Sequence, residues 1–233
     1  MLFRSKKSKK LKPDTLIKFQ IIDDNSSDEN LKKLKDLINT HSIDCEIINH
    51  DKSEHKEKIA AENNQETFGN LSSLLKCFEV AKKDPSDLIY FVEDDYLHYE
   101  HSLVDMLNTY ERVSSQHKDE IIVCPSDYPF NYMNNEKTNI LIGSQQHWRT
   151  ITKMLCTFMI SKKMFQKHID NFEKTCEKRH EPFEKYLNKI LESEIGISPI
   201  KSLAIHMTNV NSSYGLSPFI DIKKLWEENK IHQ

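Results

Sequence analysis

The stretch Leu88-Ile89-Tyr90-Phe91-Val92-Glu93-Asp94-Asp95-Tyr96 places three carboxylates directly after five apolar residues. Branched and aromatic residues in an unbroken run are typical of a strand buried on both faces of a sheet. In an open α/β sheet, ligands bind just beyond the carboxyl ends of the strands. We therefore predict a metal-dependent site at Glu93, Asp94 and Asp95, with Glu93 and Asp95 on one face of the extended backbone and Asp94 on the other. A solvated acidic loop is the alternative that composition leaves open.

Around this stretch, strand-like and helix-like runs alternate. This alternation predicts an α/β fold with a mostly parallel central sheet covered by helices. In the first half we expect strands at 15–23, 44–49, 88–92 and 120–124, and helices at 31–38, from Asn70 to 81 and at 103–113. In the second half we expect strands at 139–142, 154–160 and 199–207, and helices at 163–177, from Glu181-Pro182 onward and at 222–229.

Acidic residues also follow two other predicted strands. Asp23-Asp24 ends the first strand, and Asp127 comes just after the strand at 120–124. Like charges gathered at one sheet edge repel each other unless a cation or a polyhydroxylated ligand is bound there. The chain has only four glycines, which form neither a dinucleotide fingerprint nor a phosphate-binding loop. We therefore favour a divalent cation that neutralises a diphosphate.

Composition predicts one globular domain in the cytoplasm. The chain has 233 residues, 30% of them charged, and its apolar runs are too short to cross a bilayer. Its five cysteines are scattered, which argues against a zinc knuckle and for reduced thiols.

The charge is distributed unevenly along the chain. Residues 1–14 form a basic tail with Arg4 and five lysines in the first twelve positions. Of the 33 basic residues, 27 remain after these six, against 36 acidic residues. The acidic body argues against nucleic acid as the main partner. We expect the tail to be solvated, or at most to make a peripheral contact with an anionic membrane.

Two motifs resemble those of a known family. The stretch Phe19-Gln-Ile-Ile-Asp-Asp-Asn-Ser-Ser-Asp28 resembles the strand and Asp-Asp-x-Ser turn of family 2 glycosyltransferases of the GT-A fold, and Tyr90-Phe-Val-Glu-Asp-Asp-Tyr96 resembles their metal-binding Asp-x-Asp strand. Weaker similarity covers Gln146-His-Trp-Arg149, His180-Glu181-Pro182, Ala204-Ile-His206 and Ser217-Pro218-Phe219. The resemblance implies a GT-A-like three-layer sandwich in a single domain at 15–233. Its nucleotide-sugar-binding half would be 15–127, and its acceptor-binding half 128–233.

The resemblance also implies roles in binding a nucleoside diphosphate sugar donor. Asp23 or Asp24 would accept a hydrogen bond from the nucleotide base, and the helix starting at Asn70 would lie between the two motifs. Asp95 would bind Mn²⁺ or Mg²⁺ that bridges the diphosphate. Its helpers would be Glu93 and Asp94, near the ribose or the metal's water shell, and His206, completing the metal shell.

On the acceptor side, the resemblance implies a general base at the start of a helix. Glu181 matches it best, and Glu184 is the alternative one turn on; either could instead be an ordinary helix-start carboxylate. Asp127 would hold sugar hydroxyls. Trp148 would stack on a sugar ring and Arg149 would contact phosphate, although a Trp beside a strand is usually a core residue.

The expected function is therefore metal-dependent, inverting sugar transfer to a hydroxyl acceptor in glycan or polysaccharide synthesis. The alternatives are a catalytically silent GT-A-like module that binds a glycan or a partner, and a sugar nucleotidyltransferase, which would be expected to carry a glycine-rich basic loop. The family's first strand and its Pro-Thr-Tyr-Asn-like turn have no counterpart before Thr15. We therefore expect a sheet that starts one unit late, or a sequence that is part of a longer protein.

Overall fold

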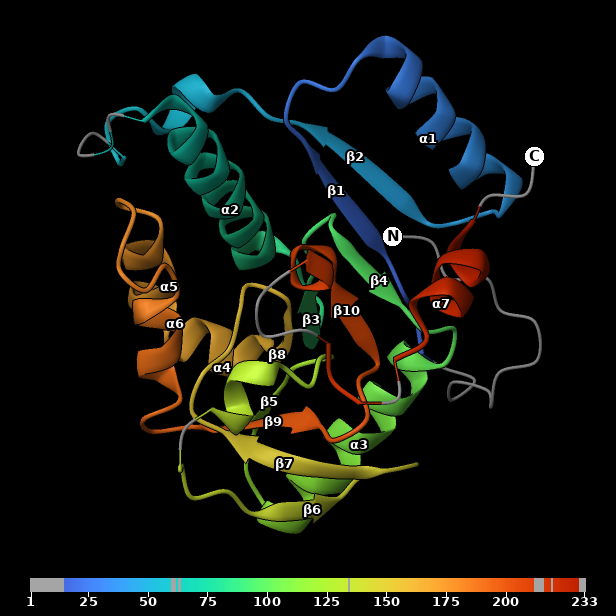
Figure 1. The fold of residues 1–233 in the computed structure, drawn as a ribbon. Coiled ribbons are helices and arrows are strands. Elements are labelled where there is room, and N and C mark those ends of the chain that lie inside the picture. Colours follow the sequence, from blue (N-terminus) through green and yellow to red (C-terminus); the bar gives the residue numbers. More distant parts are fainter. Residues whose placement is uncertain are drawn as a thin grey trace. The chain divides into compact units, whose positions relative to one another are not determined.

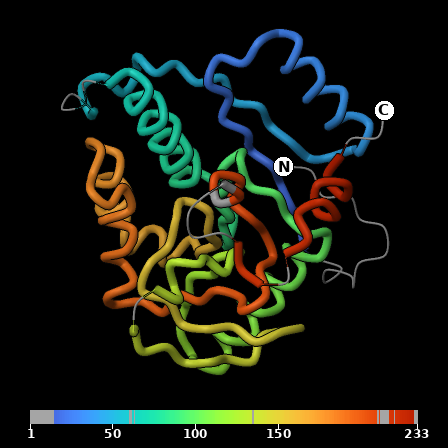
Figure 2. Tube along the Cα trace, viewed as in Figure 1, coloured from blue at the N-terminus to red at the C-terminus, as the bar shows by residue number. Residues whose placement is uncertain are grey.

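The computed structural model of the protein describes residues 15–59, 62, 64–133, 135–211, 216–218 and 220–230. The contacts between these residues divide them into two compact units, each described by itself below. Unit 1 contains residues 86–168 and 186–230, and unit 2 contains residues 15–85 and 169–185. Figure 2 traces the course of the chain through these segments by residue number. The single domain with halves at 15–127 and 128–233 stays a prediction. The basic tail and Phe219 lie outside the described residues.

Unit 2 begins with two parallel strands. Strand β1 (Phe19–Asp23) pairs with β2 (Cys45–Asn49) over its whole length, so that Asp23 lies opposite Asn49. Helix α1 (Asp28–Thr40) connects the two strands and runs alongside them (Figure 1). It begins after Ser27, whose hydroxyl accepts a hydrogen bond from the backbone N–H of Asn30. The predicted strand, acidic turn, helix and strand are all present here.

The rest of unit 2 is helical. After the short 3₁₀ helix η1 (Lys52–His55), helix α2 (Gln65–Lys83) starts five residues before the predicted Asn70. The helix begins earlier because the side chain of Asn64 caps it by accepting a hydrogen bond from the N–H of Thr67. The spacing of apolar residues does not reveal such a cap. Phe78 on the buried face of α2 packs edge-on against Phe172 of helix α5 (Ile169–Thr175), with ring centroids 5.1 Å apart.

Unit 1 is built on a six-stranded sheet in the order β3-β8-β5-β9-β7-β6. Its strands are β3 (Leu88–Phe91), β5 (Ile121–Val123), β6 (Ile140–Ile142), β7 (His147–Ile151), β8 (Phe158–Ser161) and β9 (Ile195–Pro199). The predicted α/β class is confirmed. The mostly parallel sheet is wrong, because within the described part of this sheet only β5 and β9 pair in parallel.

One short connection and the position of one strand explain why the sheet is mixed. Strands β6 and β7 are joined by residues 143–146, and a link this short can only form an antiparallel pair. Strand β8 lies antiparallel between β3 and β5, the strands that the prediction placed as parallel members of one sheet. The residues at 147–149, predicted to lie between two strands, belong to β7.

Helices pack around this sheet. Helix α3 (Ser102–His117) packs against β5, and Met106 and Val113 of this helix share one core with Ile121, Trp148 and Ile197 of the sheet. The remaining helices are α4 (Lys162–Lys167), α6 (Lys185–Ile190, whose first residue belongs to unit 2), α7 (Ile222–Asn229), and the 3₁₀ helices η2 (Pro129–Tyr132) and η3 (Met207–Asn211). The predicted helix at 163–177 is two helices, α4 and α5. Within the described ranges, no helix combines the length and apolarity that crossing a bilayer requires.

A second, two-stranded sheet in unit 1 brings two distant parts of the sequence together. Strand β4 (Tyr96–His98) pairs antiparallel with β10 (Ala204–His206), and the register sets His206 opposite Tyr96. This pairing places the end of β10 beside the acidic turn that follows β3.

Candidate metal centre

The acidic stretch crosses from one sheet of unit 1 to the other. Strand β3 ends at Phe91, and β4 begins at Tyr96, so Glu93, Asp94 and Asp95 lie on the connection between them. The β4–β10 pairing continues beyond His206, because the backbone N–H of Met207 donates to the carbonyl oxygen of Asp95 at 2.9 Å. The backbone therefore fixes Asp95 and His206 next to each other.

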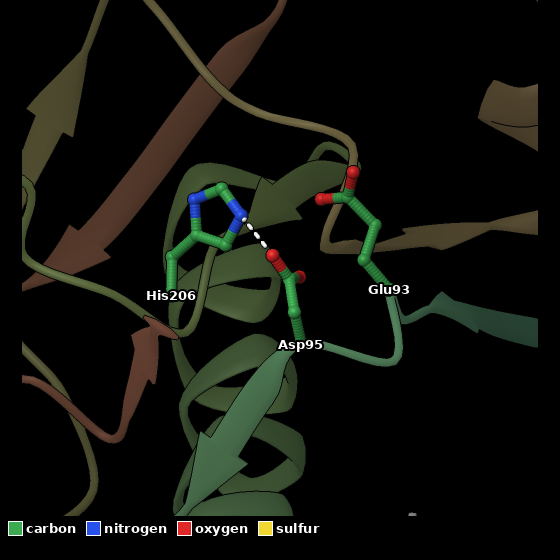
Figure 3. A group of neighbouring side chains, drawn as sticks. All are labelled: Glu93, Asp95 and His206. Carbon is green, nitrogen blue, oxygen red and sulfur yellow. Dashed lines mark ion pairs between the residues drawn. The ribbon is translucent and has the colours of Figure 1, made fainter. Parts of the chain in front are cut away.

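Glu93, Asp95 and His206 form one cluster (Figure 3). One carboxylate oxygen or ring nitrogen from each residue lies within 4.8 Å of the other two. Nε2 of His206 is 2.7 Å from Oδ2 of Asp95, and all three residues are half-buried. Asp94 is exposed and is not part of the cluster. The structure thus brings together the three residues that the sequence proposed as metal ligands.

A buried threonine holds Glu93 in place. The backbone N–H of Glu93 donates to Oγ1 of Thr157 at 3.0 Å, and the Thr157 hydroxyl donates to Oε2 of Glu93 at 3.3 Å. Thr157 is fully buried, immediately before β8. Because one hydroxyl contacts both the backbone and the carboxylate of Glu93, it restricts the rotamers of that side chain. The sequence carried no signal for this contact, since residue 157 is 64 positions from Glu93.

Two other residues orient the imidazole of His206. The Tyr96 ring stacks on it, with centroids 4.8 Å apart and an interplanar angle of 14°. The Tyr96 hydroxyl is itself hydrogen-bonded to the Tyr128 hydroxyl at 2.6 Å, and burial raises the pKa of Tyr96, so this phenol stays neutral. On the other side, Nδ1 of His206 is 2.9 Å from Oγ1 of Thr208. The imidazole is therefore held on one face and at one edge.

The donor set fits a divalent cation of the Mn²⁺ type. Carboxylate oxygens suit Mg²⁺ and Mn²⁺, and a single imidazole is compatible with a first-row transition metal. Ligands at about 2.1 Å from one ion lie roughly 3 Å apart when adjacent and about 4.2 Å apart when opposite. The spacing within 4.8 Å is thus close to what one ion requires.

Asp127, expected to hold sugar hydroxyls, is enclosed by protein. Its Oδ1 forms an ion pair with Arg149, its Oδ2 accepts a hydrogen bond from the Tyr132 hydroxyl, and the side chain is fully buried. The Arg149 guanidinium also lies over the Tyr132 ring, 3.9 Å from its centroid. Burial raises the pKa of Asp127 above its usual value despite these partners. Both carboxylate oxygens are therefore occupied, and Arg149 is committed to Asp127 rather than to a phosphate.

The expected sugar-stacking role of Trp148 does not fit the structure. Its side chain is fully buried in the core of unit 1, so neither face of the ring is open to a ligand. A Cβ at Gly143 would be 2.2 Å from the Trp148 ring, which shows how closely the β6–β7 turn covers it. The cause is the position of Trp148 within β7, a strand in which Trp148, Arg149 and Ile151 are all buried.

Two of the predicted donor-binding residues of unit 2, Asp23 and Asp24, lie at the end of strand β1. Asp23 is buried, and Asp24 forms an ion pair with Lys52 at 2.8 Å. Lys52 also packs over Gly69 of α2, where an added Cβ would lie 3.1 Å from its Nζ. Asn70 is the next residue along α2 and is exposed. Their proposed contacts with a nucleotide stay predictions.

The predicted helix start at Glu181-Pro182 is wrong. The Glu181-Pro182 peptide bond is cis, and helix α6 begins only at Lys185. Glu181 is exposed and Glu184 is half-buried, both ahead of the helix. Neither carboxylate therefore occupies the first turn that would provide a favourable helix dipole.

A scan against models of known protein families gives no match for this chain, and a comparison with curated proteins gives none either.

Proposed function

We propose that the protein is a metal-dependent glycosyltransferase that moves a sugar from a nucleoside diphosphate donor to an acceptor hydroxyl. The observation that carries the proposal is the cluster of Glu93, Asp95 and His206 beyond the end of β3. The motif resemblance predicts these three residues as metal ligands. His206 lies more than a hundred positions from Glu93 and Asp95 along the chain. The proposal includes a GT-A-like arrangement, inversion of configuration at the anomeric carbon of the sugar, and a cytoplasmic location.

In this proposal Asp95, Glu93 and His206 hold Mn²⁺ or Mg²⁺. The cation supplies charge that offsets the negative charge developing on the leaving nucleoside diphosphate. Thr157 keeps Glu93 oriented through its two hydrogen bonds, and Tyr96 keeps the His206 ring in one plane. The site therefore needs little reorganisation of these side chains to bind the ion.

The direct test measures release of nucleoside diphosphate from a panel of nucleoside diphosphate sugars, with Mn²⁺ and with a chelator. We expect Mn²⁺-dependent release that is lost in Asp95→Ala. The matched control is Glu192→Ala, which removes an exposed carboxylate of the same unit. If Asp95→Ala and Glu192→Ala release nucleotide equally well, the metal assignment is wrong. Mn²⁺ binding without turnover of any donor would favour the catalytically silent module.

The motif resemblance alone supports the proposed general base, Glu181 or its alternative Glu184, since both residues precede helix α6. Replacing the base by Gln removes the group that takes the proton from the acceptor hydroxyl, while the donor site is unchanged. We therefore expect Glu181→Gln to lose transfer but to retain Mn²⁺-dependent donor binding, measured by calorimetry. Loss of transfer only in Glu184→Gln would reassign the base.

A further inference from the structure

A buried chain of polar side chains in unit 2 lies outside the proposed catalytic residues. We call it the histidine relay; its members are His50, Ser72, His55 and Glu79. Nε2 of His50 and Nδ1 of His55 are each 2.8 Å from the Ser72 hydroxyl oxygen, and Nε2 of His55 is 3.2 Å from Oε2 of Glu79. Ser72 is fully buried, and the two histidines are 5% and 1% exposed. The relay connects the end of β2 and η1 to α2.

The direction of the hydrogen bonds in the histidine relay follows from the ionised state of Glu79. Burial opposes ionisation of Glu79, but hydrogen bonds from Lys58 and His55 outweigh it and lower the pKa of this carboxyl. An ionised carboxylate only accepts hydrogen bonds, so Nε2 of His55 carries a hydrogen. In a neutral His55, Nδ1 is then an acceptor, and the single hydroxyl hydrogen of Ser72 must point to it.

The direction of the Ser72 hydroxyl hydrogen also determines the tautomer of His50. Since the Ser72 hydroxyl already donates to His55, its oxygen can only accept from Nε2 of His50. Nδ1 of neutral His50 therefore bears a lone pair. This nitrogen is buried and has no hydrogen-bond partner among the residues that the structure describes. The His50 backbone N–H donates to the carbonyl oxygen of Asp23, which places the residue where β1 and β2 end.

We propose that the histidine relay is a pH-driven polarity switch, in which a proton taken up at Nδ1 of His50 moves positive charge to His55. A proton taken up at Nδ1 of His50 leads Nε2 to pass its own proton to the Ser72 oxygen, and the former hydroxyl hydrogen moves to Nδ1 of His55. One proton enters, none leaves, and the positive charge ends on His55 beside Glu79. His50 is again neutral but has become a donor at Nδ1.

The surrounding charges favour this end state. Burial, followed by the nearby His55, lowers the pKa of His50, so charge does not remain on that ring. His55 touches Glu79, which also pairs with Lys58. The other charged groups that act on His50 are Asp24 from the turn after β1, Glu54 from η1 and Lys76 from α2. Acidification thereby changes a buried nitrogen at the strand ends from acceptor to donor without charging it.

The test is ¹⁵N NMR of the histidine rings of the full chain, from pH 8 to pH 5. At pH 8 we expect His50 to be neutral with its hydrogen on Nε2. At the pH where His55 carries two hydrogens, His50 should still be neutral, with its hydrogen on Nδ1. The proposal is overturned if His50 keeps its hydrogen on Nε2 after His55 is charged, or if His50 itself becomes charged first. This measurement needs only the wild-type chain.

Two variants test the coupling. Ser72→Ala removes the connecting hydroxyl, so the tautomer of His50 should no longer follow the charge of His55; Ser73→Ala, the neighbouring position on α2, is the control that should keep the coupling. Glu79→Gln removes the negative charge beside His55, and the switch should then occur at lower pH. An unchanged switch in Ser72→Ala or an unshifted one in Glu79→Gln would contradict the relay.

Discussion

Among single residues, Thr157 makes two hydrogen bonds to Glu93 that orient its side chain. Replacing it by the isosteric Val removes both hydrogen bonds to Glu93 without changing the volume of the side chain. Because groups that orient metal ligands typically contribute about 10-fold to 100-fold in affinity, we expect Thr157→Val to weaken Mn²⁺ binding by roughly 10-fold. Calorimetry would measure this change. Thr175→Val, which removes a buried hydroxyl of α5 in unit 2, should leave the affinity unchanged.

The buried pair of Asp127 and Arg149 predicts a structural cost. Arg149→Leu would leave the Asp127 carboxylate buried without its cation, which typically costs about 3–5 kcal/mol. The free energy of unfolding in urea measures this loss. Lys153→Met breaks the exposed pair between Lys153 and Glu136 and should cost less than about 1 kcal/mol. Equal losses in the two variants would show that the Asp127–Arg149 pair does not stabilise unit 1.

Some site residues could be predicted from the sequence and others could not. Glu93, Asp95 and His206 belong to motifs that are visible along the chain. Thr157 could not be predicted, because its role depends on how β8 lies against β3. For Trp148, the motif resemblance implies stacking on a sugar ring, whereas the alternative of a core residue is the one that its burial supports.

At the scale of elements, the turn between β6 and β7 depends on a glycine. An added Cβ at Gly143 would lie 2.2 Å from the buried Trp148 ring, which has no room to move within the core. We expect Gly143→Ala to destabilise unit 1 by about 1–3 kcal/mol. The two tryptophans, Trp148 and Trp226, both lie in unit 1, so tryptophan fluorescence during urea unfolding measures this unit.

Gly69→Ala is the matched control for that prediction. The nearest atom to its added Cβ is the end of the Lys52 side chain at 3.1 Å, which can shift, and Ala favours the helical backbone of α2. Its effect should be neutral or stabilising. If Gly143→Ala is no less stable than Gly69→Ala, the close packing of the β6–β7 turn is wrong.

The elements themselves were predictable where local signals determine them. The helices predicted at 31–38 and 222–229 correspond to α1 and α7, and the alternation of strand-like and helix-like runs indicated the α/β class. Strand order depends on contacts between distant residues, such as β8 lying between β3 and β5. The alternation of strands and helices along the chain does not encode that order, which is why the mostly parallel sheet was predicted wrongly.

At the scale of the whole molecule, buried histidines make stability depend on pH. Burial lowers the pKa of His98 to about 3, against about 6.5 in an unfolded chain, and its Nε2 lies 2.5 Å from the Tyr90 hydroxyl. Between these values the unfolded chain binds more protons than the folded one. The stability that His98 contributes is therefore complete above about pH 6.5 and is lost as the pH falls toward 3, by up to about 1.4 kcal/mol per pH unit.

Urea unfolding of unit 1 at pH 7.5 and pH 5, followed by tryptophan fluorescence, measures this loss. His98→Gln should show a smaller decrease between the two pH values than the wild type, because the variant has no titrating ring at that position. An NMR titration in which the His98 ring of the folded protein gains its proton near pH 6.5 would contradict the prediction.

The division of the molecule into two units could not be predicted from the sequence either. Residues 169–185 group with the first part of the chain, and this depends on packing such as that of Phe172 on Phe78. Both units carry acid at the ends of strands, but only in unit 1 do the described residues gather two carboxylates and an imidazole within reach of one cation.

Binding of a divalent cation by Glu93, Asp95 and His206 can be measured by titrating the protein with Mn²⁺ and following electron paramagnetic resonance. The signal of free Mn²⁺ gives the number of bound ions and their affinity, in the wild type and in Asp95→Asn, which keeps the shape of the side chain but removes its charge. We predict one Mn²⁺ bound at this cluster, with an affinity at least about 10-fold weaker in Asp95→Asn. Equal Mn²⁺ binding by the two proteins, or none by the wild type, would show that this cluster is not a cation site.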